Sequence, residues 1–259
     1  MAKGPIQATK PKLIPEQKLR EGPEELTRTS LLYWWPIVKD LGIPVPKTRI
    51  LLVNRGAILD AMEGIKPLGP EFMESVYGAA LEIGYPLFLR TDLQSGKHGW
   101  KKTCFVPNAE SLYSHMFGVA EENELGACCF GPGYNAFVFR EFLDLDVAFT
   151  AFYGDMPINR ERRYFIRDGK AECHHPYWPE EAFKGQAAAK NWKKKLRNLN
   201  EEPDEEIVLL RGYAQSVGRV LPEYWSVDFA RDKNQKWYLI DMALGDESYH
   251  WKGCSRGGG

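Results

Sequence analysis

Two aspartates near the C-terminal end of the sequence could hold a metal ion. A predicted hairpin carries Asp228 in its first strand and Asp241 in its second. With the turn centred between Lys233 and Asn234, Ser226 opposes Asp241, so the two aspartates project from one face as diagonal neighbours. Two fixed carboxylates repel each other unless a cation lies between them, and Mg²⁺ with nucleotide phosphates is the usual such cation. A hairpin with two solvated acids is the alternative.

The opposite face of the same hairpin is predicted to pack into a core. That face carries Trp225, Val227, Phe229, Tyr238, Ile240 and Met242. Shifting the pairing by one residue would turn one aspartate into this apolar set. The hydrophobic pattern therefore favours the register that brings the two acids together.

A basic loop that contains glycine is a candidate cradle for phosphates. The predicted strand 87–91 contains Arg90, and the following loop carries Ser95, Lys97 and Lys101 before another strand begins. Backbone N–H groups freed by glycine, together with several cations, suit a polyphosphate. The spacing differs from that of a Walker A motif. A solvated hairpin tip is the alternative.

A predicted strand in the middle of the chain could lie against a nucleotide base. Strand 136–143 is apolar and runs into acidic residues. Phe142 and Leu143 could then contact a flat base, while Asp144 or Asp146 accepts hydrogen bonds from ribose hydroxyls. An edge strand whose acids face water is the alternative.

A further strand places an arginine where it could contact phosphate. Arg163 precedes Asp168-Gly169, the sequence of a type I′ hairpin turn, and opposes His174 across that turn. A glutamate two residues before Arg163 shares its face, and an arginine held by an acid is suited to bidentate phosphate contact. His174 and His175 point in opposite directions, so they cannot chelate an ion together.

Composition narrows the class of protein. The 259 residues suit one large or two small domains, and 44% hydrophobic content with eight Trp indicates a substantial core. The five Cys are odd in number and lack C-x-x-C spacing, which predicts reduced thiols in a cytoplasmic protein rather than a zinc knuckle or disulfides. The apolar runs are too short for a bilayer, and no secretory leader is expected. A net charge of −1 gives no global argument for nucleic-acid binding.

The elements that must position these residues are short strands mixed with helices. Residues 1–27 are expected to form an extended arm, and residues 28–80 an N-terminal region with a helix at 29–40 and a strand at 48–53. The strands expected after residue 85 are 87–91, 103–106, 136–143, 162–167, 171–175, 225–230 and 237–242. The expected helices are 109–122, 180–200 and 203–220. Without β-α-β alternation, the class is α+β with antiparallel sheets.

In this order the pieces resemble an ATP-grasp domain over roughly residues 80–250. The closest resemblance is to the ATP-grasp clade named for one arginine and two lysines, common in phages and bacteria, and to the cell-division-cycle 123 family. The motifs that carry it are Arg140-Glu-Phe, Glu161-Arg-Arg-Tyr-Phe-Ile166 and Leu239-Ile-Asp241. The resemblance implies two α+β subdomains with antiparallel sheets that clasp a nucleotide. Their expected ranges are 81–143, with the phosphate loop, and 144–259, with the metal ligands.

The same resemblance implies roles for individual residues around ATP. Arg90 takes the place of the usual first lysine, and Lys97, with Lys101 as the second choice, is the loop lysine over the phosphates. Arg163 faces the γ-phosphate. The residues implied at the base and ribose are Glu141, Phe142, Leu143 and Asp146.

Magnesium is the implied metal, and here the sequence departs from the family pattern. Asp228 and Asp241 are implied as ligands of Mg²⁺. An asparagine commonly follows the second acid by two residues, but Ala243 occupies that position and cannot coordinate a cation. Either the second metal is lost, or Asp246 or Glu247 takes its place.

The function implied is an ATP-dependent, ADP-forming carboxylate–amine ligase with an acyl-phosphate intermediate. Its acceptor, an amino acid, a peptide or a protein, is not encoded in any legible pattern. The leading alternative is an ATP-binding assembly or regulatory protein without ligase turnover. A third hypothesis is a nucleic-acid-modifying or nucleic-acid-binding protein that uses the basic helix 184–197, although such a charge run is usually a solvated face.

Overall fold

The computed structural model describes residues 27–130, 133–152, 156–185, 189–251 and 254. The predicted N-terminal arm lies outside these residues except for Thr27. Antiparallel sheets and helices are mixed along the chain, which confirms the α+β prediction. Within the described part of the chain, no helix has the length and apolarity that a bilayer crossing requires.

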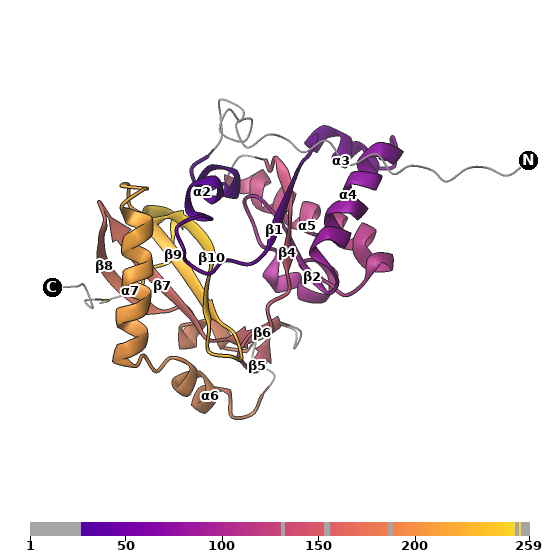
Figure 1. Cartoon of the computed structure of the whole chain (residues 1–259). Coiled ribbons are helices and arrows are strands. Elements are labelled where there is room, and N and C mark those ends of the chain that lie inside the picture. The colour runs from indigo at the N-terminus through magenta and orange to yellow at the C-terminus, as the bar shows by residue number, and fades with distance from the viewer. Residues whose placement is uncertain (1–26, 131–132, 153–155, 186–188, 252–253, 255–259) are drawn as a thin grey trace, which may run out of the picture.

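The first sheet has the strand order β1-β4-β2-β3, and its neighbouring strands pair antiparallel. Its strands are β1 (Thr48–Leu52), β4 (Ala136–Glu141), β2 (Leu87–Thr91) and β3 (Phe105–Val106). The helices that pack on it are α3 (Arg55–Met62), α4 (Pro70–Ile83) and α5 (Ala109–Phe130). In Figure 1 these helices gather on one side of the sheet.

Alternation in β2 and β4 gives the first sheet two different faces. Leu87, Leu89, Phe137 and Phe139 are all buried in the cluster with α3, α4 and α5. The residues between them therefore point away from these helices, because successive side chains of a strand alternate. Arg90 pairs with Val138 and Phe88 pairs with Arg140, so both arginines lie on this second face.

The second sheet has the order β10-β9-β7-β8 and is also antiparallel. Its strands are β7 (Glu161–Arg167), β8 (Lys170–Pro176), β9 (Trp225–Arg231) and β10 (Trp237–Leu244). One face packs on α7 (Asp204–Gly218) and on α2 (Leu31–Val38), which lies within the helix predicted at 29–40. Figure 1 shows α7 lying along this sheet, on the opposite side of the molecule from α3 and α4.

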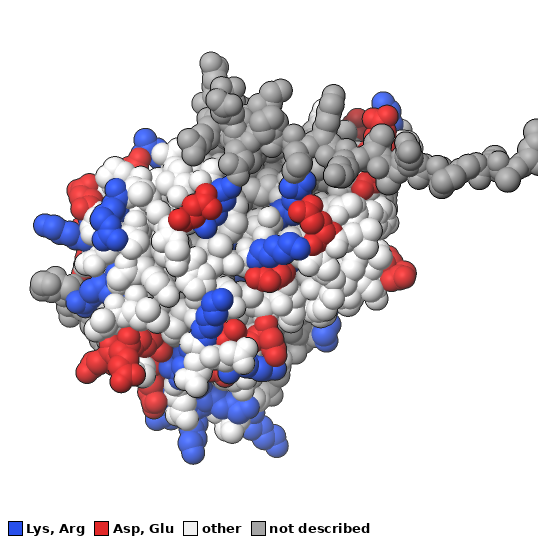
Figure 2. All heavy atoms as spheres, in the orientation of Figure 1, with Lys and Arg blue, Asp and Glu red and all other residues white. Residues whose placement is uncertain are grey.

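A third, smaller unit lies at one end of the molecule. It consists of β5 (Val147–Ala151) and β6 (Met156–Asn159), with the 3₁₀ helix η2 (Glu180–Phe183) and helix α6 (Trp192–Leu199). Figure 2 shows lysine and arginine side chains gathered where α6 lies in Figure 1. Part of this charge has protein partners: Lys193 is 2.6 Å from Glu180, and Lys195 donates to the Ala148 carbonyl.

Most predicted strands and helices are present, with several boundary errors. The helix predicted at 109–122 continues to Phe130, and the helix predicted at 180–200 is two pieces, η2 and α6. The loop after Arg90 does not run straight into a strand, because the 3₁₀ helix η1 (Lys97–Lys102) intervenes. Four further elements, α3, α4, β5 and β6, were not predicted from the sequence.

The predicted register of the C-terminal hairpin is wrong by one residue at its turn. Arg231 pairs with Trp237, and Asp232 pairs with Lys236 through backbone and side-chain hydrogen bonds. The loop between them has three residues, with Gln235 at φ +66°, rather than the two that were assumed. Three-residue hairpin loops commonly end in such a left-handed residue.

A β-bulge at Ile240 then restores the predicted proximity of the two aspartates. Leu239 pairs with Phe229, but Asp241 pairs with Asp228, so Ile240 is the extra residue. The two acids are direct rather than diagonal neighbours. The predicted core face is corrected accordingly: Trp237 and Leu239, not Tyr238 and Ile240, pack in the core.

The predicted Asp168-Gly169 turn is present, but the pairing beyond it differs from the prediction. Both residues have positive φ, +48° and +78°, and Arg167 pairs with Lys170. A bulge between Phe165 and Ile166 shifts the strands by one residue. Arg163 is therefore opposite His175, not His174.

Candidate functional site

A pocket lies between the two large sheets and the small unit. It is lined by Pro46, Phe88, Arg90, Ser95, Lys97, Trp100, Arg140, Glu141, Phe142, Leu143, Leu145, Met156, Pro157, Asn159, Glu161, Ile240 and Asp241. The charged residues come from β2, η1, β4, β7 and β10, elements that are far apart in the sequence. The pocket is thus a product of the tertiary structure.

A row of four polar residues crosses the second sheet beside this pocket. From β8 to β10 it runs His175, Arg163, Asp228 and Asp241, each paired with the next in the strand register. This face is opposite the one that packs on α7, because Tyr164, Val227 and Met242 point into that core. The two aspartates share one face, as predicted, and Arg163 lies on the same face.

Each aspartate of this row already has an arginine partner. Arg163 donates from Nε and Nη2 to the two carboxylate oxygens of Asp228, both at 2.8 Å. Arg90 Nη1 lies 2.9 Å from Asp241 Oδ1. Burial would raise the pKa of Asp241, but Arg90 and then Arg140 hold that pKa below its ordinary value. Each of the two acids is therefore paired with a protein cation in this structure.

A lysine–glutamate pair closes the neighbouring wall of the pocket. Gly96, at φ +60°, turns the chain into η1 and sets Lys97 at its start. Lys97 Nζ lies 3.3 Å from Glu161 Oε2, and Glu161 is buried. Burial would lower the pKa of Lys97, but Glu161 raises it above its ordinary value, so the side chain is a cation in the pocket.

Arg140 is a further cation of the pocket to which sequence analysis gave no role. It is 3% exposed, donates from Nη1 to the carbonyl of the bulge residue Ile240, and lies over the ring of Trp35. Burial, reinforced by Arg90, lowers its pKa to about 9. The available signal was alternation along β4: because Phe137 and Phe139 face the helices, Arg140 lies on the second face of the first sheet.

The opposite end of the pocket is apolar and aromatic. Phe142 lies against Phe105 and Trp100, with ring centroids 5.0 and 6.2 Å away, and Leu143 also lines this end. The Glu141 carboxylate accepts from the backbone N–H of Lys47 at 2.9 Å, which ties the strand end to the chain before β1. A flat apolar ligand could lie here.

Three of the residues predicted to bind the nucleotide, Lys101, Asp146 and Arg163, do not line this pocket, and neither does the predicted metal ligand Asp228. Lys101 is exposed at the end of η1. Asp146 lies outside the lining and is paired with Arg231 Nη2 at 2.7 Å. Glu247, proposed as a replacement for the missing asparagine, accepts instead from Thr29 Oγ1 at 2.6 Å, and Asp246 is exposed.

The donor set at the aspartates fits a magnesium ion that phosphate oxygens help to coordinate. Both donors are carboxylates, which hard cations prefer, and they are direct neighbours across two strands. Within the described residues, no third His, Cys or acidic side chain joins them in a compact group. Both oxygens of Asp228 accept from Arg163, so an ion would share this carboxylate with the guanidinium group.

Comparisons with known proteins point to one fold. The model of an ATP-grasp domain family, family 3 of the clade named for one arginine and two lysines, matches residues 77–254. A search of curated proteins found no match. C-terminally truncated Cdc123 from Schizosaccharomyces pombe is similar in structure, with a TM-score of 0.53 at 13% identity, and the match covers 90% of this chain and 86% of that one.

Two ligases also match in structure, each over part of its length. They are N5-carboxyaminoimidazole ribonucleotide synthetase from Thermotoga maritima (TM-score 0.44, 12% identity) and D-alanine–D-alanine ligase from Bacillus anthracis complexed with ATP (0.45, 13%). The matches cover 83% and 84% of this chain but only 41% and 53% of theirs. At 13% identity, the match to Cdc123 shows the fold alone.

Proposed function

Because the chain belongs to family 3 of this clade of ATP-grasp domains, we propose that it is an ATP-dependent ligase that joins a carboxylate to an amine. One observation carries this proposal: a single pocket has an aromatic end at Phe142 and a cationic end at Arg90, Arg140 and Lys97. Such a pocket is complementary to a flat base joined to a polyphosphate.

The chain's own residues would bind and orient the nucleotide as follows. Phe142 and Leu143 contact adenine, and the Glu141 segment fixes the edge of the base. Arg90 and Lys97 bind the phosphates from two walls of the pocket, and Arg163 contacts the γ-phosphate after it exchanges a hydrogen bond with Asp228. The predicted contact of Asp146 with ribose needs a movement of that side chain toward the pocket, and Lys101, the second choice for the loop lysine, is not part of the proposed site.

Asp228 and Asp241 would hold the magnesium ion. The ion supplies charge neutralisation and orientation of the phosphates when it is bound. Without it, the two carboxylates lie beside the phosphate site as negative charges that Arg163 and Arg90 only partly balance. We also propose a cytoplasmic location, because the sequence predicts reduced cysteines.

The reaction transfers the γ-phosphoryl group and then joins two substrates. A substrate carboxylate oxygen attacks the γ-phosphorus, the bond to the β,γ-bridging oxygen breaks, and ADP leaves. The amine nitrogen attacks the acyl carbon, the bond to phosphate breaks, inorganic phosphate leaves and the nitrogen loses a proton. The positive side chains stabilise the charge on the phosphoryl oxygens, so no nucleophilic side chain is needed.

The proposal is tested by incubating the protein with Mg-ATP and pools of amino acids or peptides, and then measuring ADP and phosphate. Release of both that depends on one pool supports the ligase. A lysine variant, Lys97→Met, separates this turnover from contaminating ATPase activity, because it removes a pocket cation. Failure of ATP to bind to the native protein would refute the nucleotide site itself.

A second candidate is an ATP-binding assembly or regulatory protein that does not turn ATP over. Two observations favour it: Ala243 lacks a ligand atom, and both oxygens of Asp228 are occupied by Arg163. A nucleotide would then stabilise one conformation without ligation. ATP binding without ADP formation in every acceptor pool is the result that favours this candidate.

A further inference from the structure

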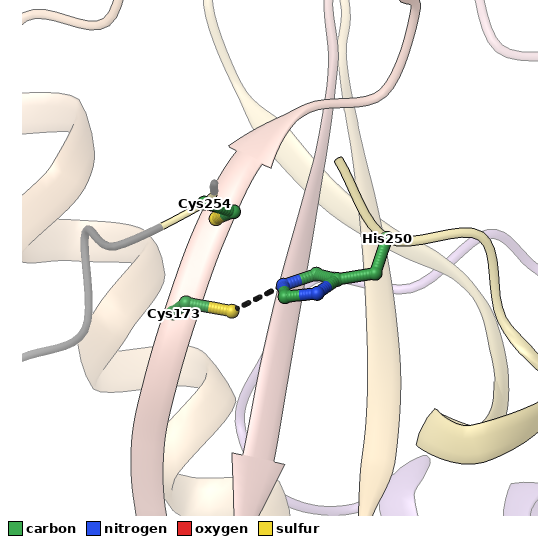
Figure 3. A group of neighbouring side chains, drawn as sticks. All are labelled: Cys173, His250 and Cys254. Atoms are coloured by element: carbon green, nitrogen blue, oxygen red, sulfur yellow. Dashed lines mark hydrogen bonds between the residues drawn. The ribbon is translucent and has the colours of Figure 1, made fainter. Parts of the chain in front are cut away.

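Two cysteines and a histidine meet on the second sheet, next to the row of four polar residues that contains Arg163 and Asp228. Cys173 lies on β8 and pairs with Phe165 of β7, the second residue along from Arg163 on that strand. His250 and Cys254 come from the chain after the 3₁₀ helix η3 (Gly245–Glu247), which returns across this face. Figure 3 shows the three side chains converging from these two segments.

The donor atoms are close enough to share one ion. The two Sγ atoms and the nearest imidazole nitrogen all lie within 4.8 Å of one another. Cys173 Sγ lies 2.8 Å from His250 Nε2, the contact drawn in Figure 3. A tetrahedral zinc ion holds sulfur at about 2.3 Å and nitrogen at about 2.0 Å, so its ligands are roughly 3.5 Å apart. Shifts of about 1 Å would reach that geometry.

The surroundings fix the orientation of these groups. The His250 ring packs edge-on against Phe165, with centroids 4.3 Å apart. Cys254 Sγ donates to the backbone carbonyl of His174 at 3.1 Å, which holds it beside β8. A large open cavity that His175, Trp251 and Cys254 help to line adjoins the cluster and gives water access to it.

Other chemistries of a thiol beside an imidazole fit less well. Cys173 is 6% exposed, and burial, followed by the nearby Cys254 thiol, raises its pKa to about 12. A catalytic cysteine needs a lowered pKa and access to substrate, so this thiol is not an activated nucleophile. Among the described residues this is the one compact group of three His, Cys or acidic side chains.

We propose that Cys173, His250 and Cys254 bind a zinc ion, with a water molecule as the fourth ligand. Two thiolates and one imidazole form the nitrogen and sulfur donor set that zinc prefers, and the two thiolate charges neutralise the ion. The ligands are spaced as His250-x-x-x-Cys254 with a distant Cys173, which differs from the C-x-x-C spacing typical of zinc sites. The sequence alone therefore did not predict this site.

The ion would fasten the C-terminal segment to the sheet beside the nucleotide pocket. In the same segment, the Tyr249 carbonyl accepts from Arg163 Nη1 at 3.2 Å. Arg163 in turn holds Asp228. Zinc at Cys173 therefore positions the Tyr249 carbonyl, which is a partner of Arg163. The proposed zinc site does not depend on whether the protein has ligase activity.

The test measures metal directly. The full chain, purified with a reducing agent and desalted after addition of zinc, is expected to keep one equivalent by elemental analysis. Its cobalt form should show thiolate charge-transfer and intense tetrahedral d–d absorption. Cys254→Ser and His250→Gln should weaken cobalt binding at least about tenfold while the folded circular dichroism spectrum is kept.

Cys104→Ser is the matched control, because Cys104 is buried elsewhere, beside Trp100, and should leave metal binding unchanged. Cys173→Ser should also lose the metal. If this substitution at a buried position prevents folding, Cys254→Ser and His250→Gln test the proposal instead. Native protein that is folded and reduced yet binds no cobalt would overturn the proposal. So would a Cys173–Cys254 disulfide in protein purified without a reducing agent in the presence of zinc.

Discussion

Asp241→Asn should change ATP binding in opposite directions with and without magnesium. The substitution keeps the size of the side chain and removes one negative charge from the cationic end of the pocket. Without a metal ion, that charge repels the phosphates, so its loss should tighten binding. With magnesium, the same side chain is a ligand, so its loss should weaken binding.

The size of the first effect follows from distances in the structure. Arg90 Nη1 is 2.9 Å from Asp241 Oδ1, and a phosphate oxygen bound to Arg90 would lie about 2.8 Å beyond it. Phosphate and aspartate charges would thus be about 6 Å apart, which gives roughly 3 kcal/mol of repulsion per charge at an effective dielectric constant of about 20. The aspartate side chain is 29% exposed, so screening reduces this to about 1–2 kcal/mol.

Titration calorimetry of ATP binding, in EDTA and in excess Mg²⁺, is the appropriate assay. In EDTA the variant should bind ATP about 5–30 times more tightly than the native protein. In Mg²⁺ it should bind about tenfold or more weakly, a loss comparable with about 1.4 kcal/mol. Asp60→Asn, an exposed carboxylate on α3, is the control and should change neither constant.

Equal shifts in both buffers would refute the reasoning, because a residue that only partners Arg90 has no reason to respond to the ion. An unfolded variant is recognised by its circular dichroism spectrum. In that case the same comparison is made at Asp228.

Three more predictions concern Lys97, Asp228 and Cys104. Lys97→Met should weaken ATP binding about tenfold or more by calorimetry, whereas Lys101→Met should change it less than about twofold, because only Lys97 lines the pocket; equal effects would contradict the assignment. Asp228→Asn should destabilise the fold by about 2–3 kcal/mol, because it leaves the largely buried Arg163 without its charged partner; thermal unfolding should move down by about 5–10 °C, and an unchanged midpoint would contradict it. Cys104, fully buried and with its pKa raised to about 12 by burial, should resist alkylation until the protein unfolds, as mass spectrometry of labelled peptides can show.

The sequence predicted much of the sheet framework because the signals are local. Apolar residues in segments such as 87–91 and 225–230 predicted the strands, and alternation within 225–230 predicted the face that packs into a core. Asp168-Gly169 fixed its turn, because few residue pairs accept positive φ at two successive positions. The same alternation also placed Arg163 and its neighbouring acid on one face.

The sequence could not fix the pairing beyond each turn. Neither the three-residue loop before Trp237 nor the bulge at Ile240 has a distinctive residue pattern, and together they made Asp228 and Asp241 direct neighbours. Since a one-residue slip exchanges the two faces of a strand, the side chains at Tyr238 and Leu239 were assigned to the wrong sides. Packing against α7 and α2 decides such a register, because it buries Leu239.

By itself, then, the sequence determined the α+β class, the strands that carry the charged residues and, through their order, the likeness to ATP-grasp domains that the family match confirmed. Only the tertiary structure decided which charges meet. Arg90 reaches Asp241 from another sheet, Arg140 joins them, and Cys173 meets His250 across 77 residues of chain. The physical reason is range: alternation and turn chemistry act between neighbours in sequence, whereas a pocket or a metal cluster forms when distant elements pack their apolar faces together.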